Sequence, residues 1–310
     1  MLVFIAKRLA YMVATMIAVS VLVFLLLEIS PGNVATKVLG PYSSEEQRQI
    51  WLEDNGYNRP LYIRYGDWLA RFVTGDLGQS ARYKQPVNVM LWPRVANTGI
   101  LALAVFLVMV PLSLALGVLA GMKEGSLQDR AITVTGIVFT SVPEFASAVL
   151  VATLFVFWLG ILPGTSGMTD GFSVIELILP VMVLVLYDFG YVARMTRASM
   201  AEVMTTAYIR TAVLKGLPYW TVILRHALRN ALIAPFTVIM LQLNWLLSGV
   251  IVVEFFFSYK GFGALLLEAS LNQDIFVIEA CAMVAVFVAV ASQTLSDIGY
   301  TYLNPRIRFS

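Results

Sequence analysis

The chain has 310 residues, of which 59% are hydrophobic and only 13% are charged. An ordinary soluble domain carries about 25% charged residues, so this composition excludes a soluble globular protein and predicts that most of the surface faces lipid. The formal net charge of +2 and the dispersal of basic residues between apolar runs exclude a nucleic-acid-binding surface. The one cysteine, Cys281, lies in an apolar run, which excludes an intrachain disulfide and a thiolate metal site.

Six apolar runs are long enough to cross a bilayer, which takes about 20 residues of α-helix. They are 9–27, 98–121, 132–160, 174–193, 231–254 and 276–299. An even number of spans places both termini on the same side of the membrane. The sequence therefore predicts an all-α, polytopic membrane protein of about six transmembrane helices, folded as a single domain over residues 1–310.

The first and third runs have features of their own. The first follows Lys7 and Arg8, exceeds the apolar core of a signal peptide and ends at Glu28 without a small-residue cleavage site, so we expect it to remain as a membrane helix. The third would be about 43 Å long as a straight helix at about 1.5 Å per residue. A bilayer of about 30 Å accommodates it only if it is tilted or kinked, and Pro143 is the expected kink.

The segment 29–96, here called the N-terminal polar segment, is too hydrophilic to enter the membrane and too rich in Trp, Tyr and Leu to be a plain linker. We expect it to lie outside the cell membrane and to fold against the outer mouth of the spans. Ser44-Glu45-Glu46-Gln47 has the pattern of a capping box that opens a short helix, which Gly56 closes. This helix is either an ordinary surface helix or a docking element for a soluble partner.

Basic residues indicate the orientation of the chain. The segments expected inside carry Lys7, Arg8, Lys123, Arg130, Arg194, Arg197, Arg210, Lys215, Arg225, Arg229, Arg306 and Arg308. The two short loops on the other side carry only Lys260, and the N-terminal polar segment is long enough to cross the membrane regardless of its charge. The prediction is that both termini are cytoplasmic.

The segment 194–230, here called the basic segment, is nearly free of acidic residues and yet patterned like helices. Its signals are a capping threonine, an apolar helix face, a left-handed glycine that ends the helix, and a proline in the first turn of the next helix. In that order they are Thr205 or Thr206, then Ile209 with Ala212 and Val213, then Gly216, then Pro218. The pattern predicts a short helix–turn–helix on the cytoplasmic surface.

The basic segment resembles the coupling segment of ABC importer permeases. The residues that carry the resemblance and the implied coupling role are Tyr208, Ile209, Arg210, Thr211, Ala212, Lys215, Gly216, Leu217, Pro218, Arg225, His226, Arg229 and Asn230. The general importer pattern is Glu-Ala-Ala, three residues, Gly, nine residues and Ile-x-Leu-Pro. Here Arg210-Thr211-Ala212 and Gly216 keep the first spacing, whereas the Glu and the final Pro are absent. Those departures are typical of the dipeptide and oligopeptide branch.

The resemblance to dipeptide and oligopeptide permeases extends over nearly the whole chain, with further matching segments at 6–9, 75–80, 254–263 and 304–308. It implies a bacterial inner-membrane subunit that forms half of a peptide translocation path, of the B type with a long external segment after the first helix. The implied partners are a second, homologous permease, two cytoplasmic ATPases and a periplasmic binding protein. Related importers carry oligosaccharides or nickel complexes, so the substrate stays open.

A coupling segment has a mechanical purpose, because the movement of soluble ATPases must reach the spans through a rigid element that fits a groove. The alternative is a basic helix that lies on anionic lipid. No Gly-x-x-x-x-Gly-Lys-Ser/Thr loop occurs in the chain. We therefore expect ATP and Mg to bind to the partner ATPases, and this chain to be a transport subunit without enzymatic activity, cofactor or metal.

Acidic residues and prolines within the apolar runs are candidates for a pathway or gate. Glu144, Glu176 and Asp188 are costly in lipid unless they face protein or water, so each either lines the pathway or forms a structural pair. Pro143 and Pro180 interrupt helix hydrogen bonds at membrane depth, which suits a gated path but also occurs in inert membrane proteins.

Two other classes of function compete with this interpretation. An intramembrane serine protease is suggested by the motif at 164–167 with Ser166 and by the single histidine, His226. The predicted topology places these two residues on opposite sides of the membrane, which argues against it. A secondary transporter would not need the patterned basic segment and often has inverted repeats, which the sequence does not show.

Overall fold

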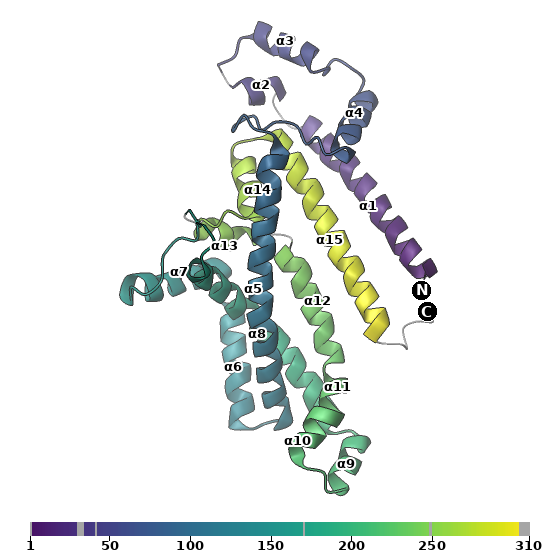
Figure 1. Ribbon diagram of the computed structural model, residues 1–310, viewed down its shortest axis with the longest axis vertical. Helices are drawn as coiled ribbons and strands as arrows, with labels where there is room; N and C mark the ends of the chain where they lie inside the picture. Colours follow the sequence, from purple (N-terminus) through teal and green to yellow (C-terminus); the bar gives the residue numbers. More distant parts are fainter. Residues whose placement is uncertain (1, 30–33, 41, 170, 248–249, 304–310) are drawn as a thin grey trace. The chain divides into compact units, whose positions relative to one another are not determined.

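The computed structural model describes residues 2–29, 34–40, 42–169, 171–247 and 250–303. Within these ranges every regular element is a helix, which confirms the prediction of an all-α fold (Figure 1). The elements are α1 (Leu2–Ile29), α2 (Val34–Leu39), α3 (Glu45–Asp54), α4 (Leu61–Val73), α5 (Val87–Met122), α6 (Leu127–Ser141), α7 (Glu144–Ala152), η1 (Thr153–Trp158), α8 (Val174–Met204), α9 (Ala207–Leu214), α10 (Tyr219–Thr221), η2 (Val222–Ala227), α11 (Leu228–Ala231), α12 (Ile233–Leu247), α13 (Ile251–Phe256), α14 (Phe262–Leu271) and α15 (Ile275–Leu303). The two η elements are π-helices. The matching segment at 304–308 lies outside the described residues.

Among the described residues, four helices are long and apolar enough to cross a membrane. They are Ala6–Leu26, Val87–Met122, Val174–Met204 and Ile275–Ile298. Two pairs of helices pass the same test together but are bent within the pair. They are Leu127–Ser141 with Glu144–Trp158, bent by 101°, and Tyr219–Ala231 with Ile233–Leu247, bent by 53°. The described part of the chain therefore has four candidate spans, or up to six if each bent pair is one span.

The third and fifth predicted runs are each divided in the structure. α6 ends at Ser141, because the fixed φ and missing N–H of Pro143 prevent the helix from continuing. The kink predicted at Pro143 is confirmed, and its angle of 101° makes α7 a distinct element. A single helix over 231–254 is wrong: α12 ends earlier, and Glu254 belongs to the short helix α13.

The chain forms two compact units, whose boundaries fall inside α5, between α13 and α14, and inside α15. Unit 1 consists of Met1–Thr98 and Lys260–Thr294, and unit 2 consists of Gly99–Tyr259 and Leu295–Ser310. The N-terminal polar segment belongs to unit 1, whereas the basic segment belongs to unit 2. Each unit has its own buried cluster of hydrophobic side chains.

The core of unit 1 joins the beginning of α5 to α14 and α15. Its fully buried side chains include Val87, Leu91, Leu265 and Cys281, which are inaccessible to solvent. Cys281 therefore packs as a small hydrophobic residue, as its place in an apolar run predicts.

A hydrogen-bonded loop fixes the entry to α5 within unit 1. The carboxylate of Asp274, just before α15, accepts hydrogen bonds from the Ser80 hydroxyl at 2.5 Å and from the backbone N–H groups of Ala81 and Arg82 at 3.2 and 3.3 Å. Asp274 is buried, so these donors satisfy a carboxylate that would otherwise be costly. The loop that follows the matching segment 75–80 thus has a structural purpose that the sequence alone did not reveal.

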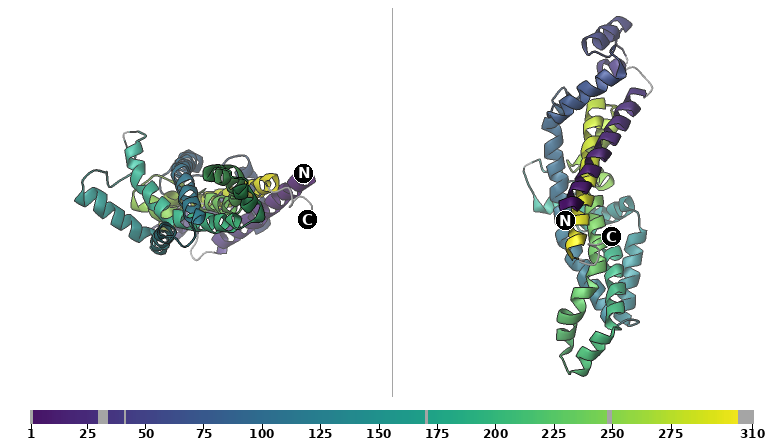
Figure 2. Two further views of the ribbon diagram at one scale, coloured as in Figure 1. Left: turned by 90° about the horizontal axis from the view of Figure 1, so that it is seen from below. Right: turned by 90° about the vertical axis from the view of Figure 1, so that its right-hand side faces the viewer.

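Close glycine contacts hold α6 and α8 together in unit 2, where Figures 1 and 2 show the two helices side by side. A Cβ placed on Gly190 of α8 would lie 2.3 Å from the carbonyl oxygen of Gly136 on α6. α5 approaches α8 equally closely, since a Cβ on Gly121 would lie 2.6 Å from the carbonyl oxygen of Arg197. Because real Cβ atoms do not approach other atoms so closely, glycine is required at these crossings and the three helices form a tight bundle.

α8 continues beyond its predicted end at residue 193 and reaches Met204, so the first part of the basic segment is the end of this helix. Pro180 lies inside α8 without ending it. Arg197 ties this part of α8 to the start of α6, because its Nε and Nη2 donate to the two carboxylate oxygens of Asp129 at 2.9 and 2.8 Å. Beyond Met204, α9, α10, η2 and α11 gather at one end of unit 2, whereas α7 and α13 lie farther along it (Figure 1).

Candidate functional site

The basic segment forms the helix–turn–helix that its pattern predicts. Gly216 follows α9 with φ +74°, the left-handed conformation expected of it, and its N–H donates to the Val213 carbonyl at 2.9 Å. Pro218 is the residue before α10. The predicted threonine cap is only half right: Thr206 occupies the N-cap position, but its hydroxyl donates to the carbonyl of Val203 instead of accepting from the α9 backbone.

One face of α9 is buried within unit 2. Ile209 and Ala212 pack with Met200 of α8 and with Val222 and Ile223 at the start of η2. Val213, predicted on the same face, is 54% exposed. It follows Ala212 by about 100° around the helix, which turns it past the narrow stripe that meets η2.

The opposite side of the basic segment exposes large apolar side chains beside cations. Its apolar members are Tyr208, Val213, Leu214, Leu217, Tyr219, Trp220 and Leu224, and its basic members are Arg210, Lys215, Arg225 and Arg229. We call these residues the exposed face. Leu214 is 81% exposed, and Trp220 is 58% exposed. Apolar side chains gathered within a charged rim are typical of a surface that another molecule covers.

The remaining predicted coupling residues lie on or beside the exposed face. Thr211 is exposed and its hydroxyl donates to the Ala207 carbonyl, as a solvent-facing threonine in a helix does. Asn230 donates its Nδ2 to the Tyr208 hydroxyl at 2.9 Å, which ties α11 to α9. His226 is half-buried on η2. Of the thirteen residues singled out in the basic segment, Ile209 and Ala212 therefore hold the hairpin together and the others surround its free side.

The three acidic residues singled out in the apolar runs fall into two different settings. The carboxylate of Glu176 accepts a hydrogen bond from the Met168 N–H at 2.8 Å, so it fastens the loop before α8. Asp188 is buried in α8, at 1% exposure, and its Oδ1 accepts a hydrogen bond from Nε2 of Gln242 at 2.5 Å. Glu144, at the start of α7 directly after Pro143, lies close enough to Asp188 for their charges to interact. Glu144 thus lies within electrostatic range of Asp188, whereas Glu176 is engaged by the loop before α8.

Gln242 is a residue of this seam that sequence reasoning missed, because its amide neither carries a charge nor interrupts a helix. A polar amide inside the otherwise apolar run of α12 is the signal that would have found it. Its neighbour one turn on, Trp245, stacks on Tyr187 of α8 with ring centroids 5.7 Å apart. α8 and α12 therefore meet along a seam that carries a carboxylate, an amide and two aromatic rings.

The loop with the protease-like motif has a structural role. The backbone N–H of Ser166 donates to the carbonyl of Phe257 at 2.7 Å, and its hydroxyl donates to the carbonyl of Glu176 at 2.5 Å. Ser166 is 1% exposed, and its hydroxyl proton is engaged. His226 belongs to η2, which follows α10 at the end of unit 2. The Ser166 loop lies beside α13, which is farther along the unit (Figure 1). The geometry offers no Ser–His pair for nucleophilic catalysis.

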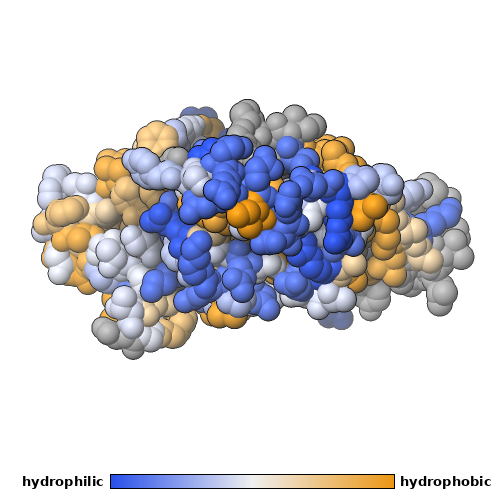
Figure 3. All heavy atoms as spheres, turned by 90° about the horizontal axis from the view of Figure 1, so that it is seen from above, coloured by the Kyte–Doolittle hydropathy of each residue, from blue (hydrophilic) through white to orange (hydrophobic). Residues whose placement is uncertain are grey.

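The N-terminal polar segment is folded, and its predicted capping box at 44–47 is confirmed. The Ser44 hydroxyl accepts from the Gln47 N–H at 3.2 Å, and the Gln47 side chain accepts from the Ser44 N–H at 3.0 Å. Gly56, just past α3, has φ +69°, as a closing glycine should. Figure 3 looks onto this end of unit 1 and shows hydrophilic residues around a small hydrophobic area.

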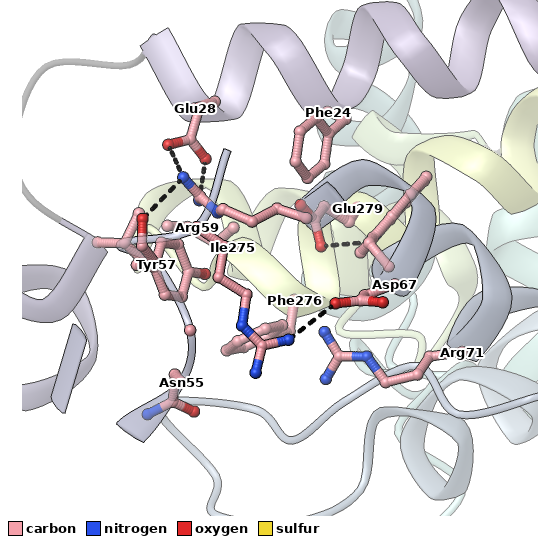
Figure 4. Close-up of a pocket in the computed structure, with 14 residues that line it drawn as sticks. Phe24, Glu28, Asn55, Tyr57, Arg59, Asp67, Arg71, Ile275, Phe276 and Glu279 are labelled. Carbon is pink, nitrogen blue, oxygen red and sulfur yellow. Dashed lines mark hydrogen bonds and ion pairs between the residues drawn. The ribbon is translucent and has the colours of Figure 1, made fainter. Parts of the chain in front are cut away.

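A polar cavity of about 80 Å³ in unit 1 lies where α4 meets α1 and α15 (Figure 4). Arg64 of α4 pairs with both carboxylate oxygens of Glu28, at 2.7 and 2.5 Å, and lies 4.2 Å from the ring centroid of Tyr57. Trp68 donates its Nε1–H to the buried carboxylate of Glu279 at 2.9 Å. Burial, and secondly the charge of Glu279, raise the pKa of the Tyr57 phenol to about 12. These bonds fix the N-terminal polar segment to the first and last long helices.

The described residues form an all-helical fold with four to six candidate spans and a basic helical hairpin at one end of a glycine-packed bundle, as expected of a polytopic membrane subunit. Family models agree with this class: "Binding-protein-dependent transport system inner membrane component" matches residues 113–309, and the corresponding N-terminal model matches residues 1–89. The chain belongs to this family. It is therefore an inner-membrane, multi-pass permease subunit of a binding-protein-dependent ABC importer, which works with an ATPase and a binding protein.

Individual relatives match along the whole chain. A Brucella abortus (strain 2308) protein named for a peptide transport system is 35% identical over 309 residues, 98% of each chain. The dipeptide transport system permease protein DppB of Alkalihalophilus pseudofirmus is 32% identical and covers 100% of each chain. The oligopeptide transport system permease protein AppB of Bacillus subtilis (strain 168) is 30% identical over 99% of each chain. The resemblance to the dipeptide and oligopeptide permeases is thus confirmed.

Proposed function

We propose that this chain forms half of a translocation path for short peptides, paired with a second, homologous permease. The support for peptides is the name of the full-length relatives, which are called peptide, dipeptide or oligopeptide permeases. Oligosaccharides and nickel complexes are the alternative substrates, and a test must distinguish them from peptides. A binding protein delivers the substrate, and two ATPases, which bind ATP and Mg, drive the cycle.

The observation that carries the coupling role is the exposed face of the basic segment. Its inner stripe, Ile209 and Ala212, is already occupied by unit 2, so the hairpin is anchored on its own chain. Its other side leaves Leu214 and Trp220 exposed with Arg210 beside them. A lipid-bound helix would direct its apolar side chains into the bilayer and its cations toward the headgroups. A rigid hairpin with a mixed apolar and basic face instead favours a groove on a soluble ATPase.

The orientation follows from this role. The exposed face meets a cytoplasmic ATPase only if the basic segment is inside, which also places both termini inside and the N-terminal polar segment outside. There, a groove lined by Leu39, Tyr42, Ile50 and Trp51 between α2 and α3 is the surface we assign to the binding protein. The acidic residues of α3 would supply charge for that contact.

Two measurements test the proposal. Reporter fusions after Gly121 and after Gly216 should read cytoplasmic, and a fusion after Gly75 should read external; the reverse pattern would exclude the assigned orientation. Proteoliposomes that contain the chain with a second permease, two ATPases and the binding protein should take up labelled di- and tripeptides. Preferential uptake of an oligosaccharide or a nickel complex would replace peptide as the substrate while keeping the transport role.

A further inference from the structure

Asp188 has a buried carboxylate oxygen that nothing satisfies. Its Oδ1 accepts from Gln242, whereas its Oδ2 is inaccessible and has no hydrogen-bond partner. An unsatisfied polar atom costs about 1–3 kcal/mol when it is buried, and more when it carries charge. Acidic groups at membrane depth are therefore rare unless they serve a partner or a ligand. The free oxygen points to a hydrogen-bond donor that is absent from the resting chain.

Glu144 of α7, a helix that packs on α8, adds a second carboxylate within electrostatic range of Asp188. It begins α7 immediately after the break at Pro143 and is half-buried, and its charge acts on Asp188. The ion pairs among the described residues involve neither acid. The nearest cation along α8, Arg194, donates its Nε to the carbonyl of Gly190 in its own helix. Two carboxylates that repel each other in a medium of low polarity favour binding of a cation between them.

The other groups at this place also suit a cation. Gln242 gives one Nε2–H to Asp188 and keeps its amide oxygen as an acceptor. The Tyr187 and Trp245 rings stack on each other on the same two helices, close in sequence to Asp188 and Gln242, and aromatic faces attract cations. Among the described residues no group of three or more His, Cys, Asp or Glu could hold a metal ion. An organic ammonium, with three N–H donors for three separate acceptors, fits this donor and acceptor set better than a metal.

We propose that Asp188, Glu144 and Gln242 bind the terminal ammonium group of a peptide during its passage through the permease. The inference rests on the proposed peptide substrate and adds the site that recognises it. Every peptide with a free amino terminus presents this group whatever its side chains, so one acidic site serves many sequences. Glu144 is only half-buried, and the ligand therefore approaches the pair from its side.

The test compares a free tripeptide of alanine with its N-acetylated form in proteoliposomes that contain all partner subunits. The affinity of the binding protein for each peptide is measured separately, and uptake is compared at equal binding-protein occupancy. Variants are Asp188→Asn and Glu144→Gln. The control is Glu176→Gln, which removes a charge at the start of α8 but keeps an oxygen for the Met168 N–H.

We expect wild type and Glu176→Gln to transport the free peptide about tenfold faster than the acetylated one. Asp188→Asn should lower uptake of the free peptide about tenfold and leave the acetylated peptide unchanged, so the ratio falls to about one. Glu144→Gln should change the ratio in the same direction, and it provides the test if Asp188→Asn does not accumulate, because its side chain is less buried.

An unchanged ratio in both variants, or an equal loss for both peptides in both variants, would overturn the site and leave Asp188 as a helix-pairing residue. Either result would leave the peptide importer itself intact, since wild type still transports. Wild type that takes up neither peptide but takes up an oligosaccharide or a nickel complex would remove both proposals.

Discussion

Replacement of Gly216 by valine should uncouple ATP hydrolysis from transport without loss of the subunit. The residue holds φ +74° and connects α9 to α10. Apart from the two neighbouring residues in the chain, no atom lies within 4 Å of the position that a Cβ would occupy, so the added β-carbon has open space. Its only direct effect is backbone strain, which is about 1–3 kcal/mol for a non-glycine residue held in such a conformation.

That strain is comparable with the free energy by which α9 is held against the rest of unit 2. Ile209 is buried to 2% exposure, which contributes about 1.5–3 kcal/mol, and the methyl group of Ala212 adds about 0.8 kcal/mol. A loss of about 1–3 kcal/mol raises the population of detached α9 by about 5- to 150-fold, since each 1.4 kcal/mol is a factor of about ten. The hairpin is thus loosened while the long helices, which do not depend on Gly216, keep their packing.

Hydrogen exchange and transport together provide the assay. Backbone amides of α9 should exchange faster in Gly216→Val by the same factor, and binding-protein-stimulated ATP hydrolysis and peptide uptake should fall at equal subunit levels. The control is Gly160→Val, another glycine with positive φ, +63°, and no atom within 4 Å, which lies in the loop after η1. The reasoning fails if α9 exchange and uptake in Gly216→Val match those of wild type, or if Gly160→Val reproduces the uncoupling.

Three further predictions concern single side chains. Arg210→Glu reverses a charge on the exposed face, so co-purification with the ATPases should weaken and depend more steeply on salt; binding equal to wild type at low and high salt would contradict the docking role. Trp68→Phe removes the donor to the buried Glu279 carboxylate and should lower the free energy of unfolding by about 1–3 kcal/mol, which a lower melting temperature would reveal. An unchanged melting temperature would show that this hydrogen bond does not stabilise the fold. Tyr57 should ionise near pH 12 instead of 10, so its stabilising effect is complete below pH 10 and lost between pH 10 and 12. The phenolate absorbance that disappears in Tyr57→Phe measures this, and a midpoint at 10 would refute it.

Local signals made much of the fold predictable from the sequence. A capping box at 44–47, a left-handed Gly216 and a break at Pro143 each depend on a few adjacent residues, and all three appear as expected. The angle at Pro143 was not predictable, because a proline ends hydrogen bonding but the direction of the next helix depends on packing against α8 and α13. The end of α12 within the fifth run was likewise not predictable, because the run contains no proline between α12 and α13 to mark the break.

Contacts between residues far apart in the chain could not be predicted from the sequence. Asp188 and Gln242 are 54 positions apart, and neither residue type indicates which residue it will contact. Ser80 and Asp274 are 194 positions apart, so the loop they form could be recognised only as part of a resemblance. Val213 was misjudged for a related reason: it lies about 100° around α9 from Ala212, and its exposure depends on how narrow the contact between α9 and η2 is, which the sequence does not show.

A single helix connects the two places in unit 2 to which we assign function. α8 carries Asp188 near its middle and ends at Met204, about 24 Å farther on at about 1.5 Å per residue, where Met200 packs on the buried stripe of α9. Between them, Gly190 meets α6 and Arg197 binds Asp129, so α6 and α8 must move as one body. At the acidic pair, α12 meets α8 through the Gln242–Asp188 hydrogen bond and the Trp245–Tyr187 aromatic stack. A displacement of α9 by an ATPase would therefore travel along the rigid α6–α8 pair and act where that pair meets α12, which is where the proposed ammonium site would open or close.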